Sequence, residues 1–390
     1  MNLRSVILLL TLMSGGMLAS GQLYISLPII DDIAKHYSIS PNLAPLIGTS
    51  FGLSYALGFL IWGPISDHYG RYLSLLMGFA LTCLATIGTA LAGSFSLEIV
   101  FRILQGLSAA SIPPIGLALL SETLPANKRS IGLALMSFSF IVAAPIAQLY
   151  AKVMGLDFSM LMLLGAGSFA ICFLGLVSIG SNHFTKHIRH TYSLKNNFKT
   201  LISNPMIMAA WAISITILFS FVIFQTLLHH SMNLEGWSGT TITILTISGM
   251  FASFIAGSGI QKFGGIIMAC FGLFLSALAL LITYFFNPLF GLAIVMLSSG
   301  TAITLPSIIS IVSIQANSLS RGMAISIYSF VIFLGASLAP IYVQLVKLSV
   351  HNLLLVPIVL LFLSILLLSI AGLRTKHLSN VNEHIKGEGI

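Results

Sequence analysis

The chain has 390 residues, of which 57% are hydrophobic and 7% are charged, and its mean hydropathy is +1.04. A water-soluble domain carries about a quarter charged residues, so this composition excludes a soluble protein and predicts many membrane-spanning helices. The apolar runs are continuous rather than alternating, which excludes a membrane β-barrel. The net charge of +8 is spread over many loops, so no nucleic-acid partner is expected.

Twelve apolar runs have about the length that a helix needs to cross the hydrocarbon core, roughly 20 residues. Their approximate ranges are about 5–30, 42–62, 73–95, 97–120, 130–153, 159–181, 206–230, 239–260, 266–286, 289–313, 322–346 and 353–373. The first run is interpreted as a retained helix rather than a signal peptide, because it is long enough to span. The predicted fold class is an all-α polytopic membrane protein.

A basic, histidine-containing linker at 182–205 separates an N-terminal six-helix half, 1–181, from a C-terminal six-helix half with a polar tail, 206–390. Residues recur at one spacing across the two halves. Pro114 and Pro306 are 192 residues apart, as are Arg129 and Arg321. This spacing predicts two pseudo-repeats, which would pack around a midplane cavity and rock against each other.

The basic residues gather on one side of the predicted spans, as they do in cytoplasmic loops. Of the seventeen Lys and Arg residues, thirteen fall on the side of the termini, three fall on the other side (Lys35, Lys152 and Lys347) and Arg102 lies within a span. Both termini are therefore expected in the cytoplasm. The linker histidines lie among basic residues that repel cations, so no metal site is predicted there.

A short polar stretch, GPISDHYGRYLS at 63–74, separates the second and third predicted spans. The second helix is expected to end at Gly63, and Gly70 supplies a backbone conformation open to few other residues. Asp67 is suited to a helix N-terminus, and Arg71 can hold its carboxylate in a forked pair. The stretch predicts a tight loop that locks two helices together at one membrane face.

A second motif, RILQGLSAA at 102–110, lies inside the fourth predicted span. Gly106 and Ala110 are four residues apart and form a small face on which another helix can approach closely. A charge such as that of Arg102 is costly inside a membrane and usually marks function. The alternatives are a helical ion pair with Glu98, four residues earlier, or a side chain that extends to the membrane surface.

The two stretches resemble motifs A and B of the major facilitator superfamily, and the resemblance covers essentially the whole chain. It implies the major facilitator fold and a secondary transporter rather than an enzyme, with no cofactor and no metal. Motif A keeps Gly63, Asp67, Gly70 and Arg71, and Glu122 is expected to complete this gating motif. The chain looks most like bacterial drug-efflux and sugar-efflux permeases, which implies the inner membrane.

In this family the first, fourth, seventh and tenth spans line the cavity. The candidates for substrate binding or proton coupling are polar residues on these spans: Gln22, Tyr24, Arg102, Gln105, Gln225, His229, Thr301 and Thr304. For the hydroxyl groups the alternative is a bond to their own helix backbone, and for His229 it is an ordinary interfacial role. None of the nine carboxylates lies in the middle of a predicted span, which disfavours a pocket for strongly cationic drugs.

Pro145 and Pro340 follow small residues in the fifth and eleventh spans, as in the family's export signature; a simple proline kink is the alternative. The predicted function is proton-coupled antiport that exports small organic compounds, drugs or metabolites, by alternating access. The alternatives are a uniporter or importer of one metabolite, or a non-transporting sensor on the same fold. The expected partners are a small-molecule substrate, protons and membrane lipids, and a monomer is expected.

Overall fold

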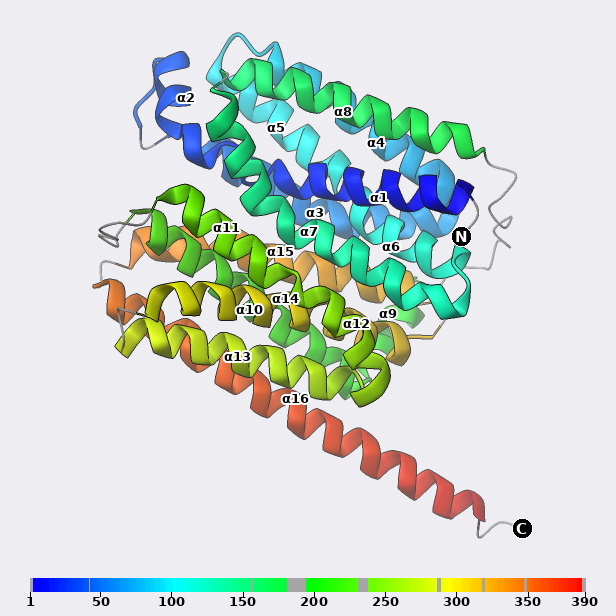
Figure 1. Ribbon diagram of the computed structural model, residues 1–390. Helices are drawn as coiled ribbons and strands as arrows, with labels where there is room; N and C mark the ends of the chain where they lie inside the picture. Colours follow the sequence, from blue (N-terminus) through cyan, green and yellow to red (C-terminus); the bar gives the residue numbers. More distant parts are fainter. Residues whose placement is uncertain are drawn as a thin grey trace. The chain divides into compact units, whose positions relative to one another are not determined.

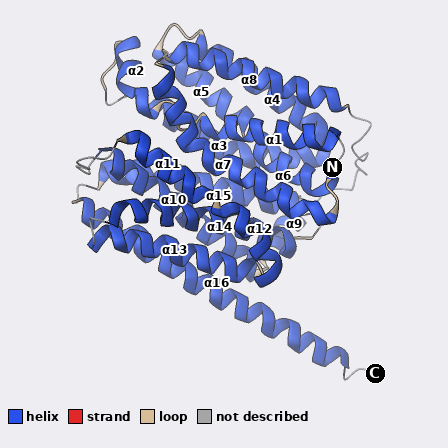
Figure 2. Cartoon of the chain, viewed as in Figure 1, coloured by secondary structure: helices blue, strands red, loops and turns tan. Residues whose placement is uncertain are grey.

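The computed structural model consists of helices and loops, and its described part contains no strand (Figure 2). It describes residues 3–41, 43–155, 157–180, 194–230, 238–285, 289–317, 320–346 and 349–387, without the side chains of some helix residues. Within this part, twelve helical segments are long and apolar enough to cross a membrane. The predicted all-α class with twelve spans is confirmed.

The elements follow one another in chain order (Figure 1). The first six candidate spans and their connecting helices are α1 (Leu3–Gly21), η1 (Leu27–Ile29), α2 (Ile30–His36), α3 (Leu46–Tyr69), α4 (Arg71–Ala90), α5 (Phe95–Ala109), α6 (Ile112–Thr123), α7 (Ala126–Met154) and α8 (Phe158–Ile179). The others are α9 (Leu194–Ile202), α10 (Pro205–His230), α11 (Gly239–Met250), α12 (Ala252–Phe263), α13 (Gly265–Phe285), α14 (Phe290–Gln315), α15 (Arg321–Leu345) and α16 (Val350–Gly387). The pairs α5–α6 and α11–α12 each form one span.

The chain divides into two compact units, Met1–Tyr192 with Gly236–Phe254, and Ser193–Glu235 with Ile255–Ile390. In the first unit α1 packs against α6, α7 and α8, and α5 packs against α3 and α4. In the second unit α10 packs against α14, α15 and α16, and α13 packs against α14 and α16. Residues 236–254 group with the first unit because α11 packs against α7.

Glycines at a repeated spacing shape the two units in the same way. Gly70 and Gly264 are 194 residues apart, and their φ angles of 90° and 86° are strained for residues with a Cβ. A Cβ on Gly106 would lie 2.5 Å from a backbone oxygen of α3, and one on Gly300, again 194 residues later, would lie 2.5 Å from a backbone oxygen of α13. Both glycines therefore let two helix backbones approach closely, which supports the predicted duplication.

The first helix ends earlier than predicted. α1 ends at Gly21, and Gln22 and Tyr24 lie in the turn that leads to η1, whereas the sequence predicted helix to about residue 30. Pro28, the second residue of η1, has no backbone N–H to donate, so one α-helix does not continue through this segment. As a result, the backbone oxygen of Gln22 is free of α-helical bonding and can accept from a side chain.

The second helix ends later than predicted, and the loop expected at 63–74 is wrong. α3 continues through Gly63 to Tyr69, and Gly70 alone separates it from α4. The positive φ of Gly70 turns the chain within one residue, so no longer loop is needed. Asp67 therefore lies in the last turn of α3, and the prediction that it begins a helix is also wrong.

The fourth span is interrupted after Ala109, where the sequence predicted one continuous helix. α6 begins with Ile112, Pro113 and Pro114, and the two prolines cannot donate to the carbonyl groups four residues earlier. The hydroxyl of Ser111 donates to a backbone oxygen of α5 at 2.8 Å. α16, by contrast, continues to Gly387, through most of the predicted polar tail.

Candidate functional site

A charge cluster joins the end of α3, the start of α4 and the end of α6. Arg71 Nη1 lies 2.5 Å from Asp67 Oδ1, and Arg71 Nε lies 3.4 Å from Glu122 Oε1. Arg71 Nη1 also donates to Ser66 Oγ. The side chains of Asp67 and Arg71 are 7% and 10% exposed, against 44% for Glu122. Water and salt therefore screen the Glu122 contact much more than the Asp67 contact.

The Gly70 turn sets this geometry, because it places Arg71 at the start of a new helix while keeping it one turn from Asp67. The second unit keeps the turn glycine, Gly264, but residues 261 and 265 there are glutamine and glycine. Both units therefore contain this glycine turn, but the charges beside it are present in the first unit alone. The structure brings together all three charged residues predicted for the gating motif.

Arg102 is the centre of a buried polar network in the first unit. Its side chain is completely buried and donates to the backbone oxygens of Ile47, at 3.2 Å, and Gln22, at 2.7 Å. It also donates to the side-chain oxygens of Gln105, at 2.6 Å, and Gln22, at 3.5 Å. Its guanidinium carbon lies 4.6 Å from the ring centroid of Phe51, a cation–π distance. One side chain therefore ties the turn after α1 and the start of α3 to α5.

Gln105 extends this network to α4. Its Nε2 donates to Thr86 Oγ1 at 2.8 Å and to Gln22 Oε1 at 3.3 Å, and Thr86 donates in turn to the Thr82 carbonyl group. Oxygen acceptors thus satisfy a guanidinium charge that burial would otherwise make costly. Three predicted cavity residues, Gln22, Arg102 and Gln105, do come together, but they lie in the closed interior of the unit in this conformation.

Glu98 lies one turn before Arg102 on α5 and is also completely buried. The hydroxyl of Tyr37, which follows α2, donates to Glu98 Oε2 at 3.4 Å, and Glu98 Oε1 has no hydrogen-bond partner among the described residues. Arg102 and Glu98 form no ion pair in this part of the chain, so the helical pair considered from the sequence is wrong for this conformation. The reason is that oxygens of Gln22, Ile47 and Gln105 already occupy the guanidinium group.

The other predicted cavity residues lie outside this network. Tyr24 is buried in the turn after α1, and Gln225 is half-buried on α10. Thr301 and Thr304 are buried on α14, where the Thr304 hydroxyl donates to the backbone of its own helix at 2.7 Å. That bond is the alternative considered for hydroxyl groups. The side chain of His229 lies outside the described residues.

The small residues of the second motif lie at the contact between α5 and α3. A Cβ on Gly106 would collide with the α3 backbone, and one on Gly58 of α3 would lie 2.6 Å from the Ala110 Cβ. Pro145 is buried inside α7, which remains helical through it. Pro340 lies on α15, and its side chain is outside the described residues.

Several partners of these residues were not predicted from the sequence. The sequence could have indicated Ser66 as a partner of Arg71, since Ser66 is next to Asp67 in the motif and one turn after Gly63, where the motif begins. Thr86 and Tyr37 carry no such signal, because each lies on a different element from the residue that it contacts. Backbone acceptors, such as the Ile47 oxygen, have no residue signature at all.

Twelve candidate spans, two compact units and the two motifs together are the features of a multi-pass membrane transporter. Residues 12–340 match the Major Facilitator Superfamily, and the chain belongs to this family. The crystal structure of the human organic anion transporter MFSD10 (TETRAN) has the same fold, with a TM-score of 0.76 at 15% identity over 93% of this chain and 99% of that chain. The prediction that the protein is a transporter and not an enzyme is confirmed.

Bacterial proteins are similar to the chain at low identity. An uncharacterized transporter of Buchnera aphidicola subsp. Schizaphis graminum is 22% identical over 85% of this chain and 82% of its own length. One of Buchnera aphidicola subsp. Acyrthosiphon pisum is 23% identical over 65% of this chain, and the match spans 64% of that protein, less than two thirds of its length. The multidrug export protein EmrB of Escherichia coli is 31% identical over 29% of this chain and 22% of its own length.

Proposed function

We propose that the protein is a proton-coupled secondary transporter that exports small organic compounds across the bacterial inner membrane by alternating access. The observation that carries this proposal is the shielded Asp67–Arg71 pair at the α3–α4 turn. Together with Glu122, it joins three helix ends into one body. A transporter that rocks two repeated units needs such rigid bodies, whereas a sensor that transports nothing has no need of a gate.

Export is the direction that the relatives favour, since EmrB is named as a multidrug export protein. Secondary rather than ATP-driven transport is favoured because the chain has no G-x-x-x-x-G-K-[ST] phosphate-binding loop. A positive charge at Arg102 and the lack of a carboxylate in the middle of a span favour neutral, zwitterionic or anionic compounds. The human relative of the same fold is named as an organic anion transporter, which is compatible with this substrate class.

Everted membrane vesicles carrying the protein test this function. A proton gradient is formed inside the vesicles and followed with a pH-sensitive dye, and fluorescein, chloramphenicol and ethidium are added in turn as anionic, neutral and cationic probes. We expect fluorescein or chloramphenicol, but not ethidium, to dissipate part of the gradient, relative to vesicles without the protein. Probe movement that continues unchanged after an uncoupler collapses the gradient would instead identify a uniporter.

The proposed orientation can be tested with single cysteines. In a variant whose native Cys83, Cys172 and Cys270 are replaced with alanine, a cysteine at Lys35 should react with a membrane-impermeant thiol reagent in intact cells. A cysteine at Lys262 should react only after the cells are opened, because the excess of basic residues predicts that loop and both termini in the cytoplasm. Both positions are exposed in the structure, so protection reports the membrane rather than burial. The reverse pattern would overturn the orientation.

A further inference from the structure

Glu98 lies in the first turn of α5, in a buried environment. Its side chain is completely buried, and one of its two oxygens has no hydrogen-bond partner among the described residues. Burying an ionised carboxylate without partners is costly, and the cost is smaller for the neutral, protonated group. The site therefore suits a group that exchanges a proton.

The groups that act on Glu98 are few. Tyr37 reaches it from the segment after α2, and the charge of Arg102 acts from one turn further along α5. α3 and α4 pack against α5, and Cys83 on α4 lies seven residues before the end of that helix, about 10 Å along its axis. Other titratable groups on the surrounding elements include Tyr24 after α1, Asp31, Asp32, Lys35 and His36 on α2, Tyr55 on α3, Tyr150 and Lys152 on α7, and Asp157 before α8. Asp67, His68 and Tyr69 end α3, and Arg71 and Tyr72 begin α4, at the opposite ends of those helices. Asp32 and Lys35 are exposed and contact each other, and Asp157 caps α8.

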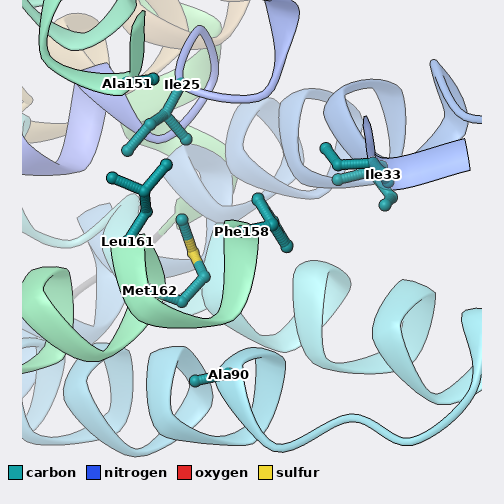
Figure 3. Packing of buried hydrophobic residues seen from close by; sticks show 8 residues of the cluster. Ile25, Ile33, Ala90, Ala151, Phe158, Leu161 and Met162 are labelled. Carbon is teal, nitrogen blue, oxygen red and sulfur yellow. The ribbon is translucent and has the colours of Figure 1, made fainter. Parts of the chain in front are cut away.

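An apolar cluster lies at this end of the unit, and among the described residues Tyr37 is the side chain that hydrogen-bonds Glu98. The cluster consists of Ile25, Ile33, Ile47, Ala90, Ala151, Phe158, Leu161 and Met162, with Tyr37, Phe95 and Ile99 packed against it. Figure 3 shows the α8 side chains Phe158, Leu161 and Met162 between Ile25 and Ala90. Tyr37 is half-buried, and its ring touches that of the exposed His36, with centroids 4.7 Å apart.

The Tyr37 hydroxyl can change its acceptor. It lies 3.4 Å from Glu98 Oε2 and also 3.4 Å from the backbone oxygen of Ala92, and it has one proton to donate. Burial, followed by the nearby charge of Glu98, raises the pKa of Tyr37, so the phenol stays a donor. It can donate to the Glu98 carboxylate, or donate to Ala92 while its own oxygen accepts from a protonated Glu98.

We propose that Glu98 binds and releases the coupling proton and exchanges it with water through Tyr37, whose phenol oxygen accepts the proton of Glu98 as its own hydroxyl proton passes to water. This inference rests on the proposed function, since it names the group behind the proposed proton coupling. When Glu98 loses its proton, its charge attracts Arg102 away from the oxygens of Gln22 and Ile47. When Glu98 regains the proton, Arg102 returns to the network that ties α5 to α3 and to the turn after α1. Protonation thereby acts on the packing of three elements.

Infrared difference spectroscopy of the purified full-length protein in lipid bilayers tests this proposal without any substrate. Spectra are recorded between about pH 5 and pH 8, where most proteins remain folded. We expect the carbonyl stretch of one protonated carboxyl group, that of Glu98, to appear as the pH is lowered and to disappear as it is raised. The wild type and Asp32→Asn, an exposed control, should both show this band. Glu98→Gln should lack this band. Wild-type and Glu98→Gln spectra that superimpose would overturn the inference.

Two further measurements keep the test decisive. If Glu98→Gln does not yield folded protein, Tyr37→Phe takes its place in the infrared measurement. It removes the hydrogen bond to Glu98 and should shift the same band, and an unshifted band would contradict the Tyr37 route.

In everted vesicles, Glu98→Gln should lose proton release driven by fluorescein or chloramphenicol. Wild-type rates in that variant would overturn this inference and leave the proposed function standing. If the wild-type protein transported a probe at the same rate with and without a proton gradient, both the proposed coupling and this inference would be overturned.

Discussion

Replacing Asp67 with asparagine is expected to lower transport about tenfold or more while leaving most of the protein in the membrane. The change keeps the shape of the side chain but removes the charge that lies 2.5 Å from Arg71 Nη1. A hydrogen bond to a charged group contributes about 1.5–3 kcal/mol, so its loss from a gate should change the balance of conformations, and hence the transport rate, about tenfold or more. Too little stability is lost to unfold a chain of twelve spans.

Asp32→Asn is the matched control, because Asp32 is an aspartate on a helix that pairs with a basic residue but is 74% exposed. Its ion pair is screened by water and should contribute little, so that variant should transport like the wild type. Both variants are compared for membrane abundance by immunoblot and for transport in everted vesicles. Wild-type transport by Asp67→Asn would remove the basis for the proposed gate.

Replacing Arg102 with alanine is expected to destabilise the first unit and to lower both membrane abundance and thermal stability. The change removes four hydrogen bonds at once and leaves the backbone oxygen of Gln22 and the side-chain oxygen of Gln105 without a donor. The Ile47 backbone oxygen still accepts from Ser50, and the Gln22 side-chain oxygen still accepts from Gln105. Each buried polar group without a partner costs about 1–3 kcal/mol, and the cavity left by the side chain adds to this. Arg102→Lys should recover part of the loss, since it keeps the charge but not the forked donor geometry.

Arg4→Ala is the control for this experiment, because Arg4 is exposed on α1. Thermal stability is measured as the fraction of detergent-solubilised protein that stays monodisperse after heating. Arg4→Ala should follow the wild-type curve, and Glu98→Gln should also stay folded, since Glu98 and Arg102 form no ion pair among the described residues. If Arg102→Ala matched the wild type in abundance and melting but was inactive, Arg102 would have a direct role in transport rather than in holding the network together.

Sequence patterns were enough to establish the membrane class, the twelve spans and the family, and they predicted the repeat and the charged residues of the gating motif. These properties depend on patterns that can be read along the chain: the length of apolar runs, the recurring spacing of prolines and arginines, and charges that are close in the chain. Asp67 and Arg71 are one helical turn apart, so their contact needs little more than the Gly70 turn between them. Even there, local patterns misplaced helix ends, because an apolar run does not reveal that one glycine can replace a loop.

The tertiary structure alone decided what surrounds Arg102 and Glu98. Arg102 bonds to backbone oxygens 55 and 80 residues away in the chain, at Ile47 and Gln22. A backbone oxygen is the same in every residue, so the sequence holds no sign of which one will accept. The sequence suggested that Glu98 would pair with Arg102 because the two are one turn apart. In the fold, oxygens of Gln22, Ile47 and Gln105 accept the hydrogen bonds of Arg102 instead. Glu98 is left buried beside Tyr37. Long-range packing therefore decides which polar groups meet.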